Sequence, residues 1–458
     1  MAIATINPTT GVTEREFDPH TDAEIDKRIA HAHAAYRSMR ATSYADRADW
    51  MRAAADILES ELDEAARMLT TEMGKTIAQA RAEVLKSAKA MRFYADNAEE
   101  FLTGRDLADP SAVNASAAYT RYEPLGVVLA IMPWNYPLWQ VIRFAAPALM
   151  AGNAGLLKHA SNVPQAALYL DTLFERGGFP TGAFRSLLIP ARAVEAVLRD
   201  RRVAAATLTG SEPAGRSVAS IAGSEVKHVV LELGGSDPFI VMPSADIDGA
   251  VATAVTSRTV NNGQACINAK RFIVHRDVYD EFVGKFTAAM AALRVGDPMD
   301  DATDVGPLAT ASGRDDIVEL VEDALAKGAV ATTGGAVTEG AGWFYPPTVL
   351  SGITPEMRLY AEEAFGPVAS VYRVDSAAEA VEIANDTTFG LSSAVWTRDE
   401  DEEAYLVRSI DAGAVFINGM SISYPELPFG GIKDSGVGRE LSVEGIREFC
   451  NLKSVWKA

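Results

Sequence analysis

The first hundred residues carry apolar positions at helical spacing after a short extended start. Ala and Ile recur at that spacing over 22–39, and strong helix formers such as Ala, Leu, Glu and Met continue over 44–71. A third amphipathic pattern covers 75–102. The chain is therefore predicted to begin with three long helices.

From Gly126 onward, short apolar runs alternate with stretches of helical periodicity. The strand candidates are 126–132, 154–160, 186–191, 204–210 and 228–233, and the intervening helices are expected over 138–150, 164–176, 193–200 and 213–222. Such alternation predicts parallel strands joined by right-handed crossovers in an open α/β sheet. Ligands of these sheets bind at the carboxyl ends of the strands.

A second alternating series follows the turn at 232–235. Its strand candidates are 237–242, 271–275, 328–335, 369–374, 392–397 and 413–419. The segment 111–125 alternates as an exposed strand or hairpin does, and the last dozen residues are expected to add an edge strand that pairs with another subunit. The fold class is therefore α/β, with two open α/β domains and a small β-strand oligomerisation extension.

Composition narrows the class of protein. The 458 residues are 48% hydrophobic and 23% charged, which is typical of a globular chain of two or three domains. Lys and Arg number 42 against 62 Asp and Glu, so the net charge of −20 disfavours nucleic acid and anionic membranes as partners. Two cysteines cannot form a disulfide framework, and neither a signal peptide nor a bilayer-spanning run is present, so we expect a cytoplasmic protein.

Several common signatures are missing from the sequence. No G-x-G-x-x-G follows a strand, no G-x-S-x-G elbow occurs, and the six histidines are scattered with no H-E-x-x-H. We therefore expect neither a metal site nor serine hydrolase activity.

Three residues stand where chemistry would be expected in an α/β protein. Cys266 lies among polar, turn-forming residues, which suits a loop that opens onto a cleft, although a lone cysteine is more often a buried hydrophobe, as Cys450 is expected to be. Glu232 ends a strand before two glycines, where it would be either a catalytic base or a solvated acid. Asn135 follows a strand between two prolines, where it would either donate to an oxyanion or close a turn.

Six ordered motifs carry a resemblance that covers almost the whole chain. They are "PWNYP", "LTGSEPAG", "LELGGSDP", "NNGQAC", "EEAFGPV" and "PFGGIKDSGVGRE". Together they resemble the NAD(P)-dependent aldehyde dehydrogenase superfamily, and the most similar branch is the bacterial succinate-semialdehyde dehydrogenases. The resemblance implies a cofactor-binding domain in 1–110 and 126–234, a catalytic domain in 235–430, and an oligomerisation extension in 111–125 and 440–458.

The resemblance also implies catalytic roles. Cys266 would attack the aldehyde carbon to form a thiohemiacetal and then a thioester, and Asn135 with the Cys266 N–H would hold the oxyanion. Glu232 would activate the water that hydrolyses the thioester, which favours water over coenzyme A as the acceptor. Arg143 would pair with the substrate carboxylate.

The other residues implied for substrate binding differ from those of some members of this branch. Some members of the branch add a second arginine, where this chain has Val260. The resemblance leaves Ser421 or Ser423 to supply the missing polar contact.

Cofactor residues are implied in the same way. The helix that opens at 209–215 would bind pyrophosphate through its free N–H groups. Lys158 would contact the adenosine ribose, and Ser161 replaces a glutamate of NAD-preferring relatives, which favours NADP with NAD as the alternative cofactor. His159 departs from the proline of many relatives. The full cofactor set is Pro133, Trp134, Lys158, Ser161, Gly210, Ser211, Leu233, Glu363 and Phe365.

The expected function is NADP-preferring oxidation of succinate semialdehyde to succinate by a homodimer or homotetramer. The same chemistry on another ω-carboxyl or aliphatic aldehyde is the first alternative. A non-enzymatic structural protein on this scaffold is the second, and the presence of all three catalytic residues argues against it.

Overall fold

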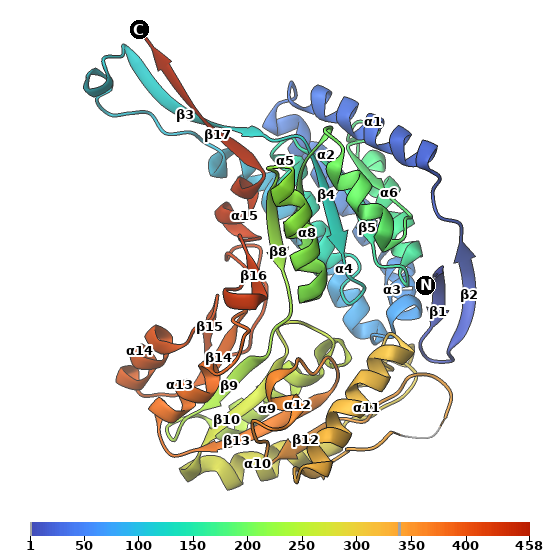
Figure 1. Ribbon diagram of the computed structural model, residues 1–458, viewed down its shortest axis with the longest axis vertical. Helices are drawn as coiled ribbons and strands as arrows, with labels where there is room; N and C mark the ends of the chain where they lie inside the picture. The colour runs from blue at the N-terminus through green and yellow to red at the C-terminus, as the bar shows by residue number, and fades with distance from the viewer. Residues whose placement is uncertain (1, 338–339) are drawn as a thin grey trace.

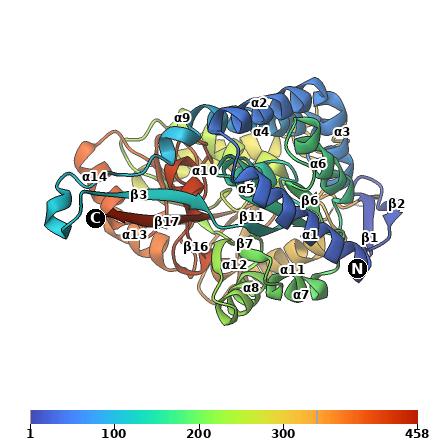
Figure 2. The same ribbon diagram turned by 90° about the horizontal axis from the view of Figure 1, so that it is seen from above.

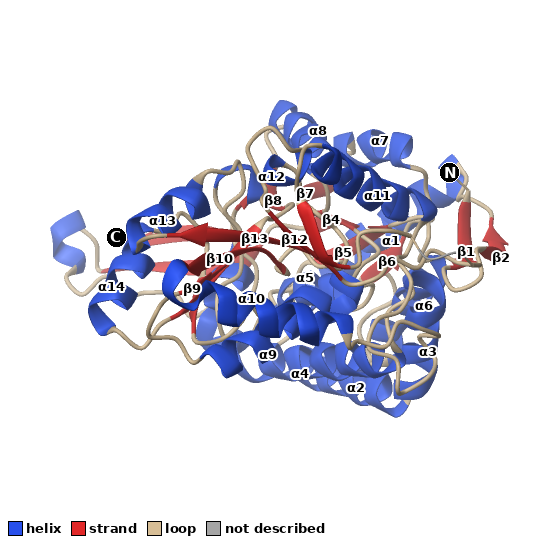
Figure 3. Ribbon diagram, turned by 90° about the horizontal axis from the view of Figure 1, so that it is seen from below, coloured by secondary structure: helices blue, strands red, loops and turns tan. Residues whose placement is uncertain are grey.

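The computed structural model describes residues 2–337 and 340–458. Figure 1 shows two α/β units, one above the other, and a long two-stranded arm that projects from the upper unit. Figure 3 shows the strands of the two large sheets in the interior, with helices on both sides. No helix in the described part of the chain is both long and apolar enough to cross a bilayer.

The chain begins with an antiparallel hairpin of β1 (Ile3–Asn7) and β2 (Val12–Phe17), followed by the helices α1 (Asp22–Met39), α2 (Tyr44–Ser60), α3 (Leu62–Met73) and α4 (Ile77–Phe101). The prediction of one helix over 44–71 was wrong, because the helix breaks at Glu61. The Glu61 carboxylate accepts hydrogen bonds from Arg176 at 2.6 Å and from the Tyr169 hydroxyl at 2.8 Å. These partners lie far along the chain, so local propensity does not reveal the break.

The upper unit contains a six-stranded sheet in the order β16-β8-β7-β4-β5-β6. Its strands are β4 (Val127–Met132), β5 (Ala154–His159), β6 (Phe184–Ser186), β7 (Val203–Thr209), β8 (His228–Glu232) and β16 (Gly436–Val437), and its helices are α5 (Trp139–Met150), α6 (Pro164–Arg176), α7 (Val194–Arg199) and α8 (Glu212–Ser224). All pairs are parallel except that of β16 with β8. The predicted strand over 186–191 was misplaced, since β6 ends at Ser186.

The lower unit contains a seven-stranded sheet in the order β11-β12-β13-β10-β9-β14-β15, parallel except at β11. Its strands are β9 (Asp237–Val241), β10 (Ala269–His275), β11 (Val330–Thr333), β12 (Thr348–Ser351), β13 (Val368–Val374), β14 (Ser393–Trp396) and β15 (Val415–Ile417). Its helices are α9 (Ile247–Thr259), α10 (Arg276–Ala291), α11 (Ala311–Ala326), α12 (Arg358–Ala361), α13 (Ala377–Asn385) and α14 (Glu400–Ser409). The pattern analysis missed β12, a short strand between prolines and a glycine.

The arm pairs β3 (Ala117–Pro124) with β17 (Cys450–Lys457), which follows α15 (Ser442–Glu448). The two strands lie side by side when seen from above (Figure 2). The C-terminal strand was correctly predicted, and in the structure one of its edges pairs with β3 of the same chain. Short 3-10 helices complete the described structure at Pro110–Val113, Ala191–Ala193, Val260–Gly263 and Lys433–Ser435.

Candidate active site

A cavity of about 220 Å³ lies where the carboxyl ends of β4, β7 and β8 face the segments that precede β10 and β13. This is the end of the upper sheet at which α/β folds bind ligands. The lining residues are Pro133, Trp134, Asn135, Gln140, Thr209, Gly210, Ser211, Leu233, Gly234, Cys266, Glu363 and Phe365. The cavity thus brings together most of the residues singled out in the sequence. Lys158, Ser161, Glu232 and Arg143 lie outside its lining.

The loop before Cys266 has an unusual backbone that its sequence explains. Asn261, Asn262 and Gly263 have φ angles of 58°, 56° and 75°, a left-handed run that Asn and Gly tolerate best. A Cβ at Gly263 would lie 2.4 Å from the carbonyl carbon of Gly366. The Asn262 amide donates to the carbonyl oxygens of Gly74 and Pro307, at 2.7 and 2.9 Å. The loop is therefore fixed before any ligand binds.

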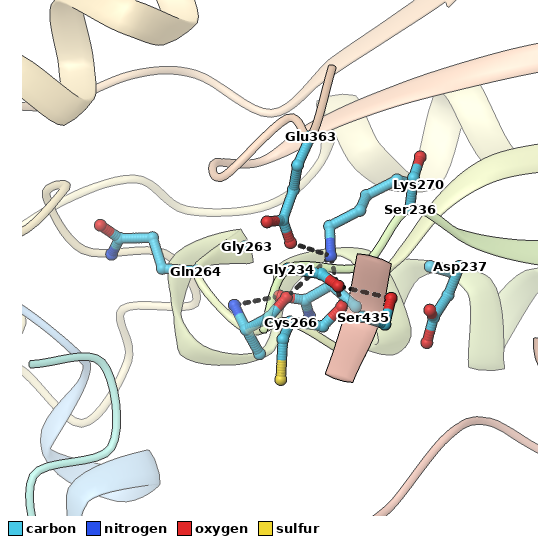
Figure 4. A network of polar contacts seen from close by, with 12 residues as sticks. Gly234, Ser236, Asp237, Gly263, Gln264, Cys266, Lys270, Glu363 and Ser435 are labelled. Atoms are coloured by element: carbon cyan, nitrogen blue, oxygen red, sulfur yellow. Dashed lines mark hydrogen bonds and ion pairs between the residues drawn. The ribbon is translucent and has the colours of Figure 1, made fainter. Parts of the chain in front are cut away.

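A lysine that the sequence reasoning missed anchors the cysteine. Lys270 on β10 donates from Nζ to the carbonyl oxygens of Ala265 and Cys266, at 3.0 and 2.5 Å, and forms an ion pair of 2.8 Å with Glu363 (Figure 4). Burial raises the pKa of the Cys266 thiol to about 12, while the positive charges of Arg143 and Lys270 oppose that rise. The resting thiol is therefore protonated, and a base must remove its proton.

Asn135 joins the loop after β4 to the cysteine loop. Its Nδ2 donates to the carbonyl oxygen of Gln264 at 3.0 Å, and Asn261 donates to the carbonyl oxygen of Asn135 at 2.8 Å. A side-chain amide has two N–H groups, so the second is left to donate to a substrate oxygen in the cavity. Asn135 and Cys266 line the same cavity, and the oxyanion role of Asn135 stays a prediction.

His159, at the end of β5, supports the same loop. Its Nδ1 accepts from the N–H of Ala160 at 2.9 Å, which leaves Nε2 to donate to the carbonyl oxygen of Pro137, also at 2.9 Å. Burial lowers the pKa of His159 to about 4, so the ring is neutral at pH 7. The histidine thus ties β5 to the segment that carries Asn135.

Glu232 ends β8 and is 2% exposed. Among the described residues neither of its carboxyl oxygens has a hydrogen-bond partner. Burial and the nearby Glu440 raise its pKa well above the ordinary value, and Arg143 acts in the opposite direction. A carboxylate with a raised pKa is a stronger base near neutral pH. Glu232 lies in the wall beside the cavity, next to Leu233 and Gly234 of the lining.

Arg143 occupies a position that differs from the sequence-based expectation. Its guanidinium is buried on α5, forms an ion pair with Glu440, and lies 4.5 Å from the centre of the Phe429 ring. Its Nη2 is 3.4 Å from the Thr209 hydroxyl. The family resemblance implied that the anionic partner of Arg143 is the substrate carboxylate. The fold supplies Glu440 instead, because a buried charge is costly unless the protein itself compensates it.

The opposite end of the cavity has the features of an anion site. Helix α8 starts after Ser211, whose side chain makes no capping hydrogen bond, so the first N–H groups stay available. A Cβ at Gly215 would lie 2.6 Å from Leu233, so this glycine lets α8 pack closely against the segment after β8. Burial lowers the pKa of Lys158. The carbonyl oxygen of Ser161 accepts a hydrogen bond of 3.0 Å from the N–H of Ala4 on β1.

A second cavity of about 230 Å³ lies on the other side of the cysteine loop, against Ala265 and Ile267, the residues that flank Cys266. The remaining lining comes from α4, from Tyr136, from the segment 257–261 that includes Val260, and from residues 420–422, including Ser421. Ser423 lies outside this lining and accepts hydrogen bonds from Lys86 and Trp139. The described residues contain no group of three or more His, Cys, Asp or Glu side chains that could hold a metal ion.

Comparison with known proteins identifies the fold family. The aldehyde dehydrogenase family matches residues 1–455. The chain belongs to this family. A Mycobacterium bovis BCG relative named succinate-semialdehyde dehydrogenase [NADP(+)] 1 is 65% identical over the full length of both chains. A Mycobacterium avium protein named succinate-semialdehyde dehydrogenase [NADP(+)] is 63% identical, over all of this chain and 97% of its own.

Solved structures agree with the assignment. The crystal structure of succinic semialdehyde dehydrogenase from Streptococcus pyogenes in complex with NADP+ has a TM-score of 0.96 and 37% identity, with 99% of each chain covered. In the present aldehyde dehydrogenase, the sequence reasoning missed Lys270, which holds the Cys266 carbonyl oxygen, and Lys86, which lines the second cavity. Lys86 falls in the middle of an amphipathic helix, where the sequence pattern does not distinguish it from a surface lysine.

Proposed function

We propose that this aldehyde dehydrogenase oxidises succinate semialdehyde to succinate, with NADP⁺ as the preferred cofactor. The observation that carries the proposal is the single cavity in which the Cys266 thiol and the Asn135 amide lie opposite the open N-terminus of α8. The names of the full-length relatives support the substrate and the cofactor.

The residues around the cavity fit NADP⁺. The free N–H groups at the start of α8, beside Gly210 and Ser211, suit the pyrophosphate. Lys158 is a partly buried amine whose pKa is lowered by burial, so an anionic 2′-phosphate would be a favourable partner. Ser161 adds no negative charge there. When bound, NADP⁺ supplies the hydride acceptor that converts the thiohemiacetal into a thioester.

The first half of the reaction belongs to Cys266 and Asn135. The Cys266 thiol gives its proton to water in the cavity, and Sγ bonds to the aldehyde carbon as the C=O bond becomes a C–O⁻ bond. The second N–H of the Asn135 amide and the N–H of Cys266 donate to that oxyanion, a contribution of about 3 kcal/mol for one such donor. Lys270 holds the carbonyl oxygen of Cys266, so the cysteine backbone stays fixed during the attack.

The second half belongs to Glu232. The carboxylate takes a proton from water, the hydroxide oxygen bonds to the thioester carbon, and the C–S bond breaks to release succinate and the Cys266 thiolate. The raised pKa of Glu232 suits this step, because the base must compete for a proton of water.

The proposal is tested by kcat/KM for succinate semialdehyde and for butyraldehyde, each with NADP⁺ and with NAD⁺. We expect the highest value for the succinate semialdehyde and NADP⁺ pair. A preference for butyraldehyde would contradict the proposed substrate, and a preference for NAD⁺ would contradict the proposed cofactor preference.

We further propose that the enzyme acts in the cytoplasm as a homodimer or homotetramer that assembles through the arm of β3 and β17. Leu452 and Trp456 are each 54% exposed on β17, which favours burial against a second subunit. Light scattering of the Leu452→Asp variant tests this assembly: a lower mass than the wild type is expected, and an unchanged mass would contradict it.

A further inference from the structure

We propose that Lys86 receives the far carboxylate of the substrate in the second cavity and so determines the specificity of the enzyme for an ω-carboxyl aldehyde. This inference rests on the proposed oxidation of succinate semialdehyde. It replaces Arg143, which the sequence reasoning assigned to the carboxylate.

The place of Lys86 is the first support. The second cavity is lined by Ala265 and Ile267, the residues on either side of Cys266, while Cys266 itself lines the first cavity. A substrate whose carbonyl lies at Sγ would place its other end in this second space. Lys86 is the only Lys, Arg or His among its lining residues in the described chain. Ala82, Val260 and Ile422 supply apolar walls that suit two methylene groups. The same lining contains the carboxylate of Glu83, which pairs with Lys75, so Lys86 is the one cation that the described lining offers to a ligand.

The second support is that no carboxylate of the described residues pairs with Lys86. Its Nζ donates to the Ser423 hydroxyl at 2.9 Å and lies 4.2 Å from the centre of the Trp139 ring. Glu83, one turn earlier, is engaged by an ion pair with Lys75 and by the N–H groups of Leu138 and Trp139.

The half-buried Lys86 ammonium has only neutral hydrogen-bond contacts and gains from an anionic ligand, because burial penalises an uncompensated charge. Lys89, one turn later on α4, shows the contrast. It is exposed and pairs with Glu426 at 2.9 Å. Arg143 is no competitor for the substrate, since Glu440 already neutralises it. Lys86 is therefore the unpaired cation that is available to a substrate carboxylate.

The electrostatic surroundings of Lys86 give a distinctive pH signature. Burial and the charge of Arg143 on α5 lower its pKa to about 7, and Lys89 acts in the same direction. Glu83 on α4 and Cys266 oppose the shift. The charged form is therefore lost as the pH rises above about 7. The KM for succinate semialdehyde should rise over pH 7–9 relative to the KM for butyraldehyde, and ionisations that affect both aldehydes cancel in that ratio.

The kinetic test compares Lys86→Met with the matched control Lys89→Met. We expect Lys86→Met to lower kcat/KM for succinate semialdehyde about 10- to 100-fold, mainly through KM, which is the range for one charged hydrogen bond. Butyraldehyde should be affected less than threefold, and Lys89→Met should match the wild type on both aldehydes. Lys86→Arg should recover part of the loss with a flat pH profile, because guanidinium stays protonated. Equal losses on both aldehydes would overturn the inference.

A second measurement does not depend on aldehyde oxidation. In the Cys450→Ala background, succinate should protect Cys266 from alkylation by iodoacetamide, and Lys86→Met should abolish that protection. Retained protection in Lys86→Met would overturn the role of Lys86. If the wild type is protected by succinate through Lys86 but does not oxidise succinate semialdehyde, the proposed function fails while this carboxylate site stands.

Discussion

Replacing Arg143 separates its structural role from a role in substrate binding. In the structure the guanidinium and the Glu440 carboxylate form a buried ion pair, with side-chain exposures of 2% and 4%. Removing one partner of such a pair leaves the other buried and uncompensated, which costs about 3–5 kcal/mol. Arg143→Met should therefore lower the free energy of unfolding by that amount.

The assay is urea unfolding followed by circular dichroism at one protein concentration, with midpoints converted by the wild-type slope. Arg52→Met is the matched control, because Arg52 and Asp96 form a surface pair of 2.8 Å with exposures of 44% and 60%. Such pairs contribute about 0–1 kcal/mol. In the double variant Arg143→Met with Glu440→Gln the buried charge is absent, so most of the loss should be recovered.

Turnover of the two aldehydes separates the structural role of Arg143 from a role in substrate binding. Because Arg143 also lowers the pKa values of Cys266 and Glu232, Arg143→Met should reduce turnover of succinate semialdehyde and butyraldehyde alike. The reasoning is refuted if the variant keeps wild-type stability and loses only its activity on succinate semialdehyde. That result would restore the substrate role predicted from the sequence.

Three other variants test the remaining assignments. Cys266→Ala should reduce turnover by several orders of magnitude while cofactor binding, measured by fluorescence titration, stays near the wild-type value, and Cys450→Ala should keep full activity. Ser161→Glu should shift the ratio of kcat/KM values toward NAD⁺, because its carboxylate repels a 2′-phosphate; an unchanged ratio would exclude Ser161 as a cofactor determinant. Glu232→Gln should show a burst of reduced cofactor in stopped-flow absorbance and then little turnover, and loss of the burst as well would contradict a role confined to hydrolysis.

Much of the fold follows from local pattern. The runs that form β4 and β7 are buried on both faces of a parallel sheet, so they appear in the sequence as continuous apolar segments between turns. The helix of 22–39 was predicted at its observed bounds, and the structure adds a capping box between Thr21 and Glu24. Local signals of this kind need no knowledge of distant residues.

The site was predictable only where a motif marked it. Cys266 and Asn135 stand out by their turn-forming neighbours, and the cavity brings both together. The partner of Arg143 lies nearly three hundred positions away, at Glu440, and only the packing of α5 against the C-terminal segment reveals it. Lys86 lacks a local signal altogether, because a lysine within an amphipathic helix is ordinarily a solvated residue.

In the proposed reaction Cys266 carries the substrate as a thioester, and the mass of the intact protein detects this bond. Glu232→Gln, mixed with succinate semialdehyde and NADP⁺, should gain about 100 Da, the mass of a succinyl group that replaces the thiol hydrogen. Peptide mapping should place this mass on Cys266, and hydroxylamine should remove it. An unmodified protein that has nevertheless reduced one equivalent of NADP⁺, or a modification on Cys450, would contradict the account.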